Sequence, residues 1–263
     1  MQHLIYSNFF VSLCTFCLCL STAILFSVNS YSVCFFVFFA TFSTYNFQRI
    51  FTEKNYISKR GVYIKKNKKS LIFISLISLF FCLNLFLKFN FLTQLIMCLS
   101  AIICFLYPFY LRRVPYLKIF LISLLWSITT VLAVIIEENI VLNIEVFSHF
   151  LSRFLFVFAI TIPFDIRDIK KDTSTILTLP ILFGEKKVKI ISFLAIFLFL
   201  LNTILQFQLN IINLKTLISL SFLILIMALL IYRSGSSKNE YYFSFWLESL
   251  SIVFLLAIVA TII

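Results

Sequence analysis

The chain is poor in acid, in glycine and in charge of either sign. Only 12% of its 263 residues are charged, ten are acidic, three of these are aspartate, and three residues are glycine. Apolar residues make up 62%. A soluble domain of this size is about half apolar and about one quarter charged, so the composition excludes a soluble globular enzyme. The same numbers exclude intrinsic disorder.

Apolar runs long enough to cross a bilayer recur along the whole chain. A spanning helix needs about 20 apolar residues, and Phe, Leu and Ile fill these runs without the alternation of a barrel strand. The expected fold is all-α, one polytopic membrane domain over residues 1–263 with nine transmembrane helices. The expected spans are 5–28, 31–50, 70–89, 92–111, 116–136, 146–164, 188–209, 212–232 and 241–263.

Basic residues are distributed unevenly between the two sides of this bundle. With the N-terminus inside, nineteen of the 22 Lys and Arg fall on the inner side, and only Lys88 and Lys215 fall outside. Such an asymmetry marks the cytoplasmic side. We therefore expect an integral protein of a bacterial inner membrane with a cytoplasmic N-terminus and an external C-terminus. The same asymmetry accounts for the net charge of +12, so no nucleic-acid partner is expected.

All three aspartates lie within eight residues, at the inner end of the sixth span. Asp165, Asp168 and Asp172 are spaced i, i+3, i+7, so on a helix their carboxylates fall within about 60° of one another. Converging carboxylates without His or Cys suit Mg²⁺, which also bridges to phosphate oxygens. The sequence therefore predicts a Mg²⁺ site, with a polar helix end at the membrane interface as the structural alternative. The basic residues of this segment are expected on the opposite helix face: Arg167, Lys170 and Lys171.

This segment resembles the second aspartate-rich motif of the UbiA superfamily of intramembrane prenyltransferases. That motif reads DxxDxxxD and is followed by TLP and a glycine, and here residues 178–180 read TLP and Gly184 follows. The stretch 107–126 is similar to the family's stretch after the fourth helix. Nine helices with two large loops on one side, about 50–69 and 165–187, also match the family.

The resemblance implies a reaction, its partners and its cofactor. An isoprenyl diphosphate loses diphosphate within the lipid bilayer, and the allylic cation alkylates an acceptor, which is often an aromatic ring. Two Mg²⁺ ions, one at each aspartate-rich loop, hold the diphosphate. Because the leaving group gains negative charge in the transition state, metal ions and Arg or Lys must already be in place. The resemblance gives the catalytic residues and metal ligands as Asp165, Asp168 and Asp172.

The chain departs from the family at the first motif, which reads NDxxDxxxD at the end of the second helix. Asn46 matches the leading Asn, whereas Phe47, Ile50 and Lys54 stand where the three aspartates would be. Glu53 lies one residue out of register, so Asn46 and Glu53 are expected to hold at most one ion. The expected diphosphate-binding residues, which can also serve only to orient the spans, are Asn46, Arg49, Arg112, Arg113 and Lys118.

Two further functions stay open at this point. The altered first motif would suit a degenerate relative that binds a prenyl lipid or assists a pathway enzyme. Arg153 and Glu248 are charges within expected spans, which are functional by default, and they would suit a small transporter. No internal repeat or pair of broken helices favours transport. Mg²⁺-dependent transfer of an isoprenyl group would decide for the enzyme.

Overall fold

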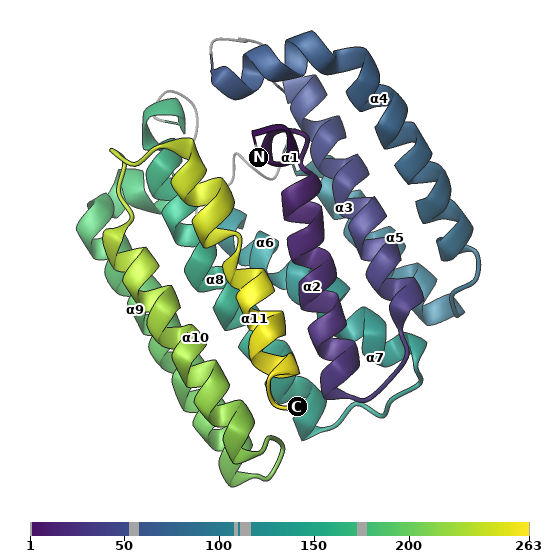
Figure 1. The fold of residues 1–263 in the computed structure, drawn as a ribbon, viewed down its shortest axis with the longest axis vertical. Helices are drawn as coiled ribbons and strands as arrows, with labels where there is room; N and C mark the ends of the chain where they lie inside the picture. The colour runs from purple at the N-terminus through teal and green to yellow at the C-terminus, as the bar shows by residue number, and fades with distance from the viewer. Residues whose placement is uncertain (1, 53–57, 108–109, 111–116, 173–177, 263) are drawn as a thin grey trace.

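The structure is a computed structural model that describes residues 2–52, 58–107, 110, 117–172 and 178–262, apart from the side chains of Thr52 and residues 170–172. Every regular element in these residues is a helix (Figure 1). Two of them, η2 and η3, are π-helices. The elements are α1 (Gln2–Tyr6), α2 (Phe9–Leu25), α3 (Tyr31–Thr52), α4 (Lys59–Phe86), α5 (Phe91–Leu106), α6 (Leu117–Ser127), η2 (Ile128–Leu132), α7 (Ala133–Glu137), α8 (Ile144–Asp172), α9 (Leu179–Gln208), α10 (Leu214–Arg233), η3 (Tyr242–Leu247) and α11 (Leu250–Val259).

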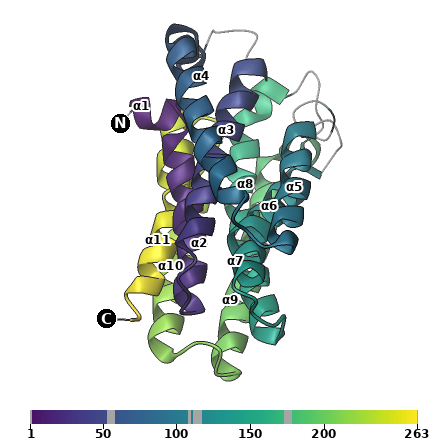
Figure 2. The same cartoon turned by 90° about the vertical axis from the view of Figure 1, so that its right-hand side faces the viewer.

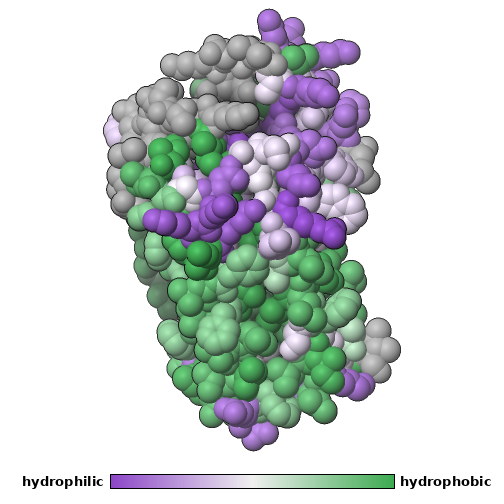
Figure 3. All heavy atoms as spheres, turned by 90° about the vertical axis from the view of Figure 1, so that its left-hand side faces the viewer, coloured by the Kyte–Doolittle hydropathy of each residue, from purple (hydrophilic) through white to green (hydrophobic). Residues whose placement is uncertain are grey.

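The predicted all-α fold with nine spans is confirmed. In the described part of the chain, nine helical segments follow the short helix α1 when α6, η2 and α7 count as one segment and η3 and α11 as another. Six segments are long and apolar enough to cross a membrane, and α2 and α5 are shorter apolar helices. Figure 3 shows an apolar belt over most of one face, with hydrophilic residues gathered at its upper end.

Helix α8 lies in the interior of the bundle. In its most apolar stretch 78% of the residues are buried, against 17% in α4, so α8 is surrounded by protein and α4 faces the lipid. Helix α8 packs against α6 and α9, while α2 packs against α3 on one side and α11 on the other. The C-terminal helix therefore returns to the N-terminal one and closes the bundle (Figures 1 and 2).

Several helices extend beyond their apolar runs at one end of the bundle. We call this the polar end, where α3 and α8 end and α4 and α9 begin, at the top of Figure 1. Helix α4 begins at Lys59, eleven residues before the predicted span, because Ser58 caps it by accepting a hydrogen bond from the Gly61 amide at 2.9 Å. Lysine is a good helix former, so the basic segment is helical rather than a loop, and it joins the apolar part of α4 across a kink at Asn67.

Helix α8 also continues past its apolar run, and it does so through Pro163. A proline has no amide proton, so the carbonyl of Ala159, four residues earlier, loses its usual partner. The hydroxyl of Ser192 on α9 donates a hydrogen bond to this carbonyl at 2.7 Å. In a lipid environment each backbone polar group must be satisfied within the protein, and α9 thus allows α8 to reach the aspartates intact.

Gly184 breaks α9 close to its beginning. Its φ of 79° and ψ of 158° lie where side-chain-bearing residues are rarely found. Residues 179–183 form a short helical segment that begins within the TLP sequence, and the long helix starts again after the glycine. The glycine therefore sets the angle at which the chain returns from the polar end into the bundle.

Candidate functional site at the polar end

The last turns of α8 carry Asp165 and Asp168 to the polar end of the bundle. Ile162 and Ile166, both fully buried, fix this part of the helix in the core. Asp165 is itself buried, at 1% exposure. Both aspartates lie on one continuous helix, as their spacing predicts, and Asp172 is its last residue. The side chain of Asp172 lies outside the described part of the structure.

Asp165 forms a buried ion pair with Lys118. Lys118 lies in the first turn of α6, and its ammonium contacts Oδ1 of Asp165. The side chains are 14% and 2% exposed, respectively. A buried carboxylate without a counter-charge is strongly unfavourable, so Lys118 allows Asp165 to remain charged inside the bundle. Lys118, which the sequence predicts as a diphosphate-binding residue, thus lies beside the first aspartate of the motif.

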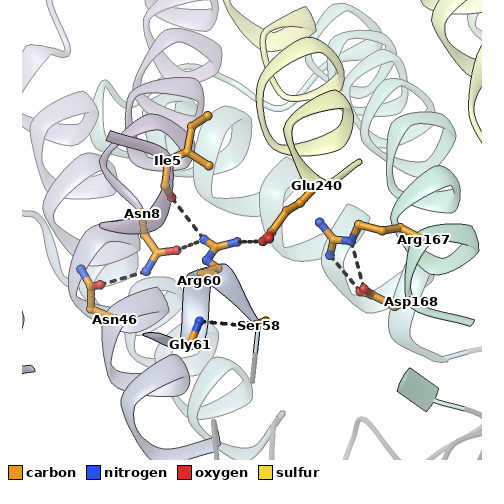
Figure 4. Close-up of polar contacts among 9 residues, drawn as sticks. All are labelled: Ile5, Asn8, Asn46, Ser58, Arg60, Gly61, Arg167, Asp168 and Glu240. Carbon is orange, nitrogen blue, oxygen red and sulfur yellow. Dashed lines mark hydrogen bonds and ion pairs between the residues drawn. The ribbon is translucent and has the colours of Figure 1, made fainter. Parts of the chain in front are cut away.

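Asp168 is paired with its own neighbour in the sequence. Nε of Arg167 donates to Oδ1 at 2.9 Å and Nη2 donates to Oδ2 at 2.8 Å, which makes a two-pronged contact (Figure 4). The guanidinium also lies over the rings of Phe164 and Phe243, at 5.1 and 5.7 Å from their centroids. The expectation that Arg167 faces away from the carboxylates was wrong, because its long side chain bends back and is held there by two rings.

Asn46 belongs to a different polar cluster, formed with Asn8, Arg60 and Glu240. Its Oδ1 accepts from Nδ2 of Asn8 at 2.9 Å, and its own Nδ2 donates to the carbonyls of Ser7 and Phe42, both at 3.0 Å. Arg60 donates to Oδ1 of Asn8 at 2.6 Å and pairs with Glu240 at 3.3 Å. Figure 4 shows this chain of contacts crossing from α3 to the segment before η3.

Two other groups lie beside this cluster. Tyr6 ends α1, and its partial burial, together with the charge of Glu240, raises the pKa of the phenol, while Arg60 opposes that shift. Glu248 follows η3, and the charged groups that act on it electrostatically include Arg60, Arg167, Arg49 and Glu240. Charged groups from α3, α4, α8 and the last span therefore converge at the polar end.

The structure brings only some of the predicted site residues together. Lys118, Asp165 and Asp168 lie at the meeting of α6 and α8, whereas Asn46 is bound to Asn8 on the other side of the cluster. Arg49, in the last turn of α3, lies among the charges near Glu248. Three predicted residues fall outside the described residues: Glu53, Arg112 and Arg113.

Arg153 and Glu248, the two charges that motivated a transporter, do not form a pair in the described residues. Nη2 of Arg153 donates to the hydroxyls of Ser21 at 2.7 Å and Thr22 at 3.3 Å, and its guanidinium lies 4.6 Å from the ring centroid of Phe254. Arg153 therefore occupies its own polar pocket of hydroxyls and a ring, away from any described carboxylate.

Three functional candidates were missed by sequence reasoning: Asn8, Arg60 and Glu240. Arg60 had been counted only among the basic residues that orient the bundle, and its contacts lie 52 and 180 residues away along the chain. No local sequence pattern predicts such contacts. The available signal was Asn8 at the start of a long apolar run, since Asn within a membrane helix needs a partner.

The donor set at the end of α8 fits Mg²⁺ in its chemistry. Asp165 and Asp168 offer carboxylate oxygens, each carboxylate has about four lone-pair positions, and the contacts with Lys118 and Arg167 use only part of them. Among the side chains that the structure describes, no three His, Cys, Asp or Glu gather as a metal-binding group. Asp172 falls outside that set, so a third oxygen ligand would come from it or from a bound phosphate, as is usual for Mg²⁺.

The apolar helical bundle, with two ion-paired carboxylates at one end of its central helix, places the protein in the class of polytopic membrane proteins with a charged site at the membrane edge. Over residues 64–250 the chain matches the model of the UbiA prenyltransferase family. This match covers most of the chain, and the protein belongs to that family. It is an integral membrane protein. No curated protein matches its sequence.

Solved structures of similar fold cover the whole chain. A UbiA homolog from Archaeoglobus fulgidus bound to GPP and Mg²⁺ has a TM-score of 0.71 at 14% identity, covering 100% of this chain and 99% of that one. A UbiA homolog from Aeropyrum pernix K1 has a TM-score of 0.70 at 14% identity, with the same coverage. A structure of digeranylgeranylglyceryl phosphate synthase has a TM-score of 0.64 at 22% identity, also with the same coverage. At these identities the similarity establishes the fold.

Proposed function

We propose that the protein is an intramembrane prenyltransferase that transfers an isoprenyl group from an isoprenyl diphosphate to an acceptor. The observation that supports this most is the placement of Asp165 and Asp168 at the polar end of α8, each held by a cation. Membership of the UbiA prenyltransferase family supports the reaction class. The bound GPP and Mg²⁺ in a homologue of the same fold support the substrate class and the metal.

The side chains of α8 and α6 have a definite task in this proposal. Asp165, Asp168 and Asp172 would hold Mg²⁺, which supplies positive charge to the departing diphosphate when it is bound. Lys118 and Arg167 keep the first two carboxylates ionised and oriented, so little reorganisation is needed when the substrate arrives. Arg112 and Arg113, just before α6, stay predicted ligands of the diphosphate oxygens, since Arg forks match phosphate geometry.

A catalytically degenerate relative is the second candidate. Its support is the altered first motif, where the ring of Phe47 packs at a tilt against those of Phe51 and Phe105, with centroids 4.5 and 5.7 Å apart. Aromatic rings replace the carboxylate expected there, and a chain that binds a prenyl lipid without turnover would tolerate that change. A transporter has less support, because Arg153 and Glu248 do not pair in the described residues. Uptake by proteoliposomes that depends on Arg153 would bring that candidate back.

The decisive experiment compares Asp168→Asn with Glu145→Gln in protein purified into lipid nanodiscs. Both substitutions remove one carboxylate from α8, but Glu145 lies in the first turn, at the opposite end from Asp168. The probes are labelled isoprenyl diphosphates of increasing length, with a membrane lipid extract as acceptor. The readouts are Mg²⁺-dependent retention of the probe and release of diphosphate.

We expect Asp168→Asn to lower turnover by about 100-fold or more, as for the loss of one preorganised electrostatic group, and Glu145→Gln to leave it unchanged. Turnover that survives Asp168→Asn would contradict the assignment of residues. Mg²⁺-dependent retention without any turnover would favour the degenerate relative over the enzyme.

We also propose that the polar end faces the cytoplasm of a bacterial cell. The basic residues of the inner loops lie at the ends of α3, α8 and α10 and at the starts of α4 and α9, and such residues collect on the cytoplasmic side. A C-terminal fusion to green fluorescent protein is then expected to be dark, because the C-terminus lies at the other end (Figure 1). A C-terminal alkaline phosphatase fusion is expected to be active. A fluorescent C-terminal fusion and an inactive phosphatase fusion would show that the polar end faces away from the cytoplasm.

A further inference from the structure

The place of the first aspartate-rich motif does not fit a metal ion. Position 47, where an aspartate would stand, is a phenylalanine that packs between Phe51 and Phe105. The next position, 50, is an isoleucine. An apolar surface cannot replace the oxygen ligands that Mg²⁺ requires. Metal binding in this half of the site would therefore depend on the polar groups that lie near the end of α3.

Asn46 is the only residue of that motif that the chain retains, and its amide is already engaged. Its Oδ1, the atom that could bind a metal, accepts from Asn8 at 2.9 Å. Its Nδ2 donates to two carbonyls, of which Phe42 belongs to its own helix. Asn46 is buried at 1% exposure and Asn8 is equally buried. The pair therefore acts as a fixed contact between α2 and α3.

A guanidinium lies next to this pair. Arg60, in the first turn of α4, donates from Nη2 to Oδ1 of Asn8 at 2.6 Å and to the carbonyl of Ile5 at 3.3 Å. Its Nη1 contacts Glu240, which comes just before η3. Arg60 is 5% exposed. Its side chain thus joins α1, α2, α4 and the last span through one buried positive charge (Figure 4).

The remaining charges near Arg60 would also disfavour a divalent cation. Arg167 of α8 is one of its electrostatic neighbours, and Glu240 and Glu248 are the acidic ones. One of those two carboxylates already pairs with Arg60 itself. A metal ion placed here would have to displace a buried, hydrogen-bonded arginine from its carboxylate.

We propose that the half of the site formed by α3 and α4 binds no divalent cation, and that the guanidinium of Arg60 is the fixed positive charge in its place. The protein then holds one Mg²⁺ per chain, at the aspartates of α8. This count rests on the proposed function for the α8 ligands, whereas the role of Arg60 rests on its own contacts. Glu240 is the counter-charge that keeps Arg60 in position.

The test is the number of Mn²⁺ ions bound per chain, measured from the free-ion signal in electron paramagnetic resonance. Protein in nanodiscs is titrated in the presence of inorganic diphosphate, with empty nanodiscs and diphosphate as the blank. We expect one Mn²⁺ in the wild type and none in Asp168→Asn. Arg60→Ala is expected to raise the count by one, because it leaves Glu240 and the buried Asn8 without their cation.

Matched variants separate charge from folding. Arg60→Lys retains the charge and is expected to keep the wild-type count, and adding Glu240→Gln to Arg60→Ala is expected to abolish the additional ion. Arg60→Gln removes the charge but preserves hydrogen-bonding capacity, so it replaces Arg60→Ala if the latter fails to fold. Each variant is checked by gel filtration before it is titrated.

The outcomes distinguish the two proposals. Two ions in the wild type would overturn the assignment of Arg60, and so would an unchanged count after the charge of Arg60 is removed. No ion in the wild type would refute the α8 metal site, and the assignment of Arg60 would then be decided by the gain in Arg60→Ala or Arg60→Gln alone. Readouts of ion number do not depend on finding the acceptor.

Discussion

Arg153 offers the sharpest prediction about what holds the bundle together. It lies in the first half of α8 at 2% exposure, and among the described residues its hydrogen bonds run from Nη2 to Ser21 and Thr22. Its Nε and Nη1 have no hydrogen-bond partner among the described residues. The perturbation is a set of three substitutions: Arg153→Met, Arg153→Lys and Arg153→Ala.

The structure allows the magnitudes to be worked out. A hydrogen bond from a charged group contributes about 1.5–3 kcal/mol, and a cation over a ring contributes about 2 kcal/mol when desolvated. Against these stand a desolvation cost of several kcal/mol for the buried ion and about 1–3 kcal/mol for each buried nitrogen without a partner. The favourable terms at Arg153 therefore do not exceed the unfavourable ones.

Arg153→Met retains most of the volume and removes the charge, so we expect stability to stay the same or rise by about 1–4 kcal/mol, as for other buried ionic groups replaced by apolar ones. Arg153→Ala removes the packing as well and is expected to cost about 2–5 kcal/mol, the range for truncation of a large buried side chain. Arg153→Lys retains a charge but loses the contact geometry, and it is expected to be destabilising.

The protein contains its own reporters for this measurement. Five of its seven free cysteines are buried and react with a thiol-specific fluorogenic dye only when the bundle opens. Replacing Cys98 and Cys104, which are exposed and intermediate, by serine removes the early signal. Arg153→Met could instead destabilise the protein as much as Arg153→Ala does. The charge would then be compensated by a group other than Ser21, Thr22 and Phe254, and the prediction would be wrong.

Three further predictions concern the α8 and α9 segments. Lys118→Met alone is expected to lower the free energy of unfolding by about 3–5 kcal/mol by removing the ammonium that pairs with a buried carboxylate. Adding Asp165→Leu is expected to restore most of that loss in a double-mutant cycle on dye-reported melting. Gly184→Ala is expected to lower the free energy of unfolding by about 1–3 kcal/mol through its backbone conformation alone, since an added Cβ meets nothing within 4 Å. Gly235 has no positive φ, so Gly235→Ala is expected to leave the stability unchanged. Ser192→Ala is expected to cost about 1–3 kcal/mol by stranding the carbonyl that the proline of α8 leaves free; stability equal to that of the parent would show that lipid or water satisfies this carbonyl.

The all-α membrane fold and the placement of Asp165 and Asp168 on one helix could be predicted because both depend on local patterns. Apolar runs of membrane length determine the segments, and the i, i+3 spacing places Asp165 and Asp168 on one face of any helix that contains both. The boundaries could not be predicted in the same way. Hydropathy reports where a helix leaves the lipid, whereas α4 starts at Lys59 because of its cap and of the helix propensity of lysine.

The π-helices are another feature that hydropathy does not reveal. Within the fifth span, Thr129 and Thr130 turn their hydroxyls back onto the carbonyls of Leu125 and Trp126, at 2.8 and 2.6 Å. Such bonds compete with the regular helical pattern, and η2 begins at this point. The sequence shows two threonines among apolar residues, which any helix tolerates, so the wider turn could not be foreseen from it.

The contacts of Arg60 were beyond prediction for a different reason. Its partners belong to the first and last parts of the chain, and only the closure of the bundle by α11 against α2 brings Glu240 within reach. Seen from the sequence, the loss of the first aspartates leaves a gap in the site. In the structure, Phe47 packs against other rings there, and the neighbouring Asn46 contacts Asn8, which accepts a hydrogen bond from Arg60. We therefore propose positive charge on both sides of the polar end: Arg60 supplies it on one side, and a metal ion at the aspartates of α8 supplies it on the other. The number of bound Mn²⁺ ions tests this arrangement.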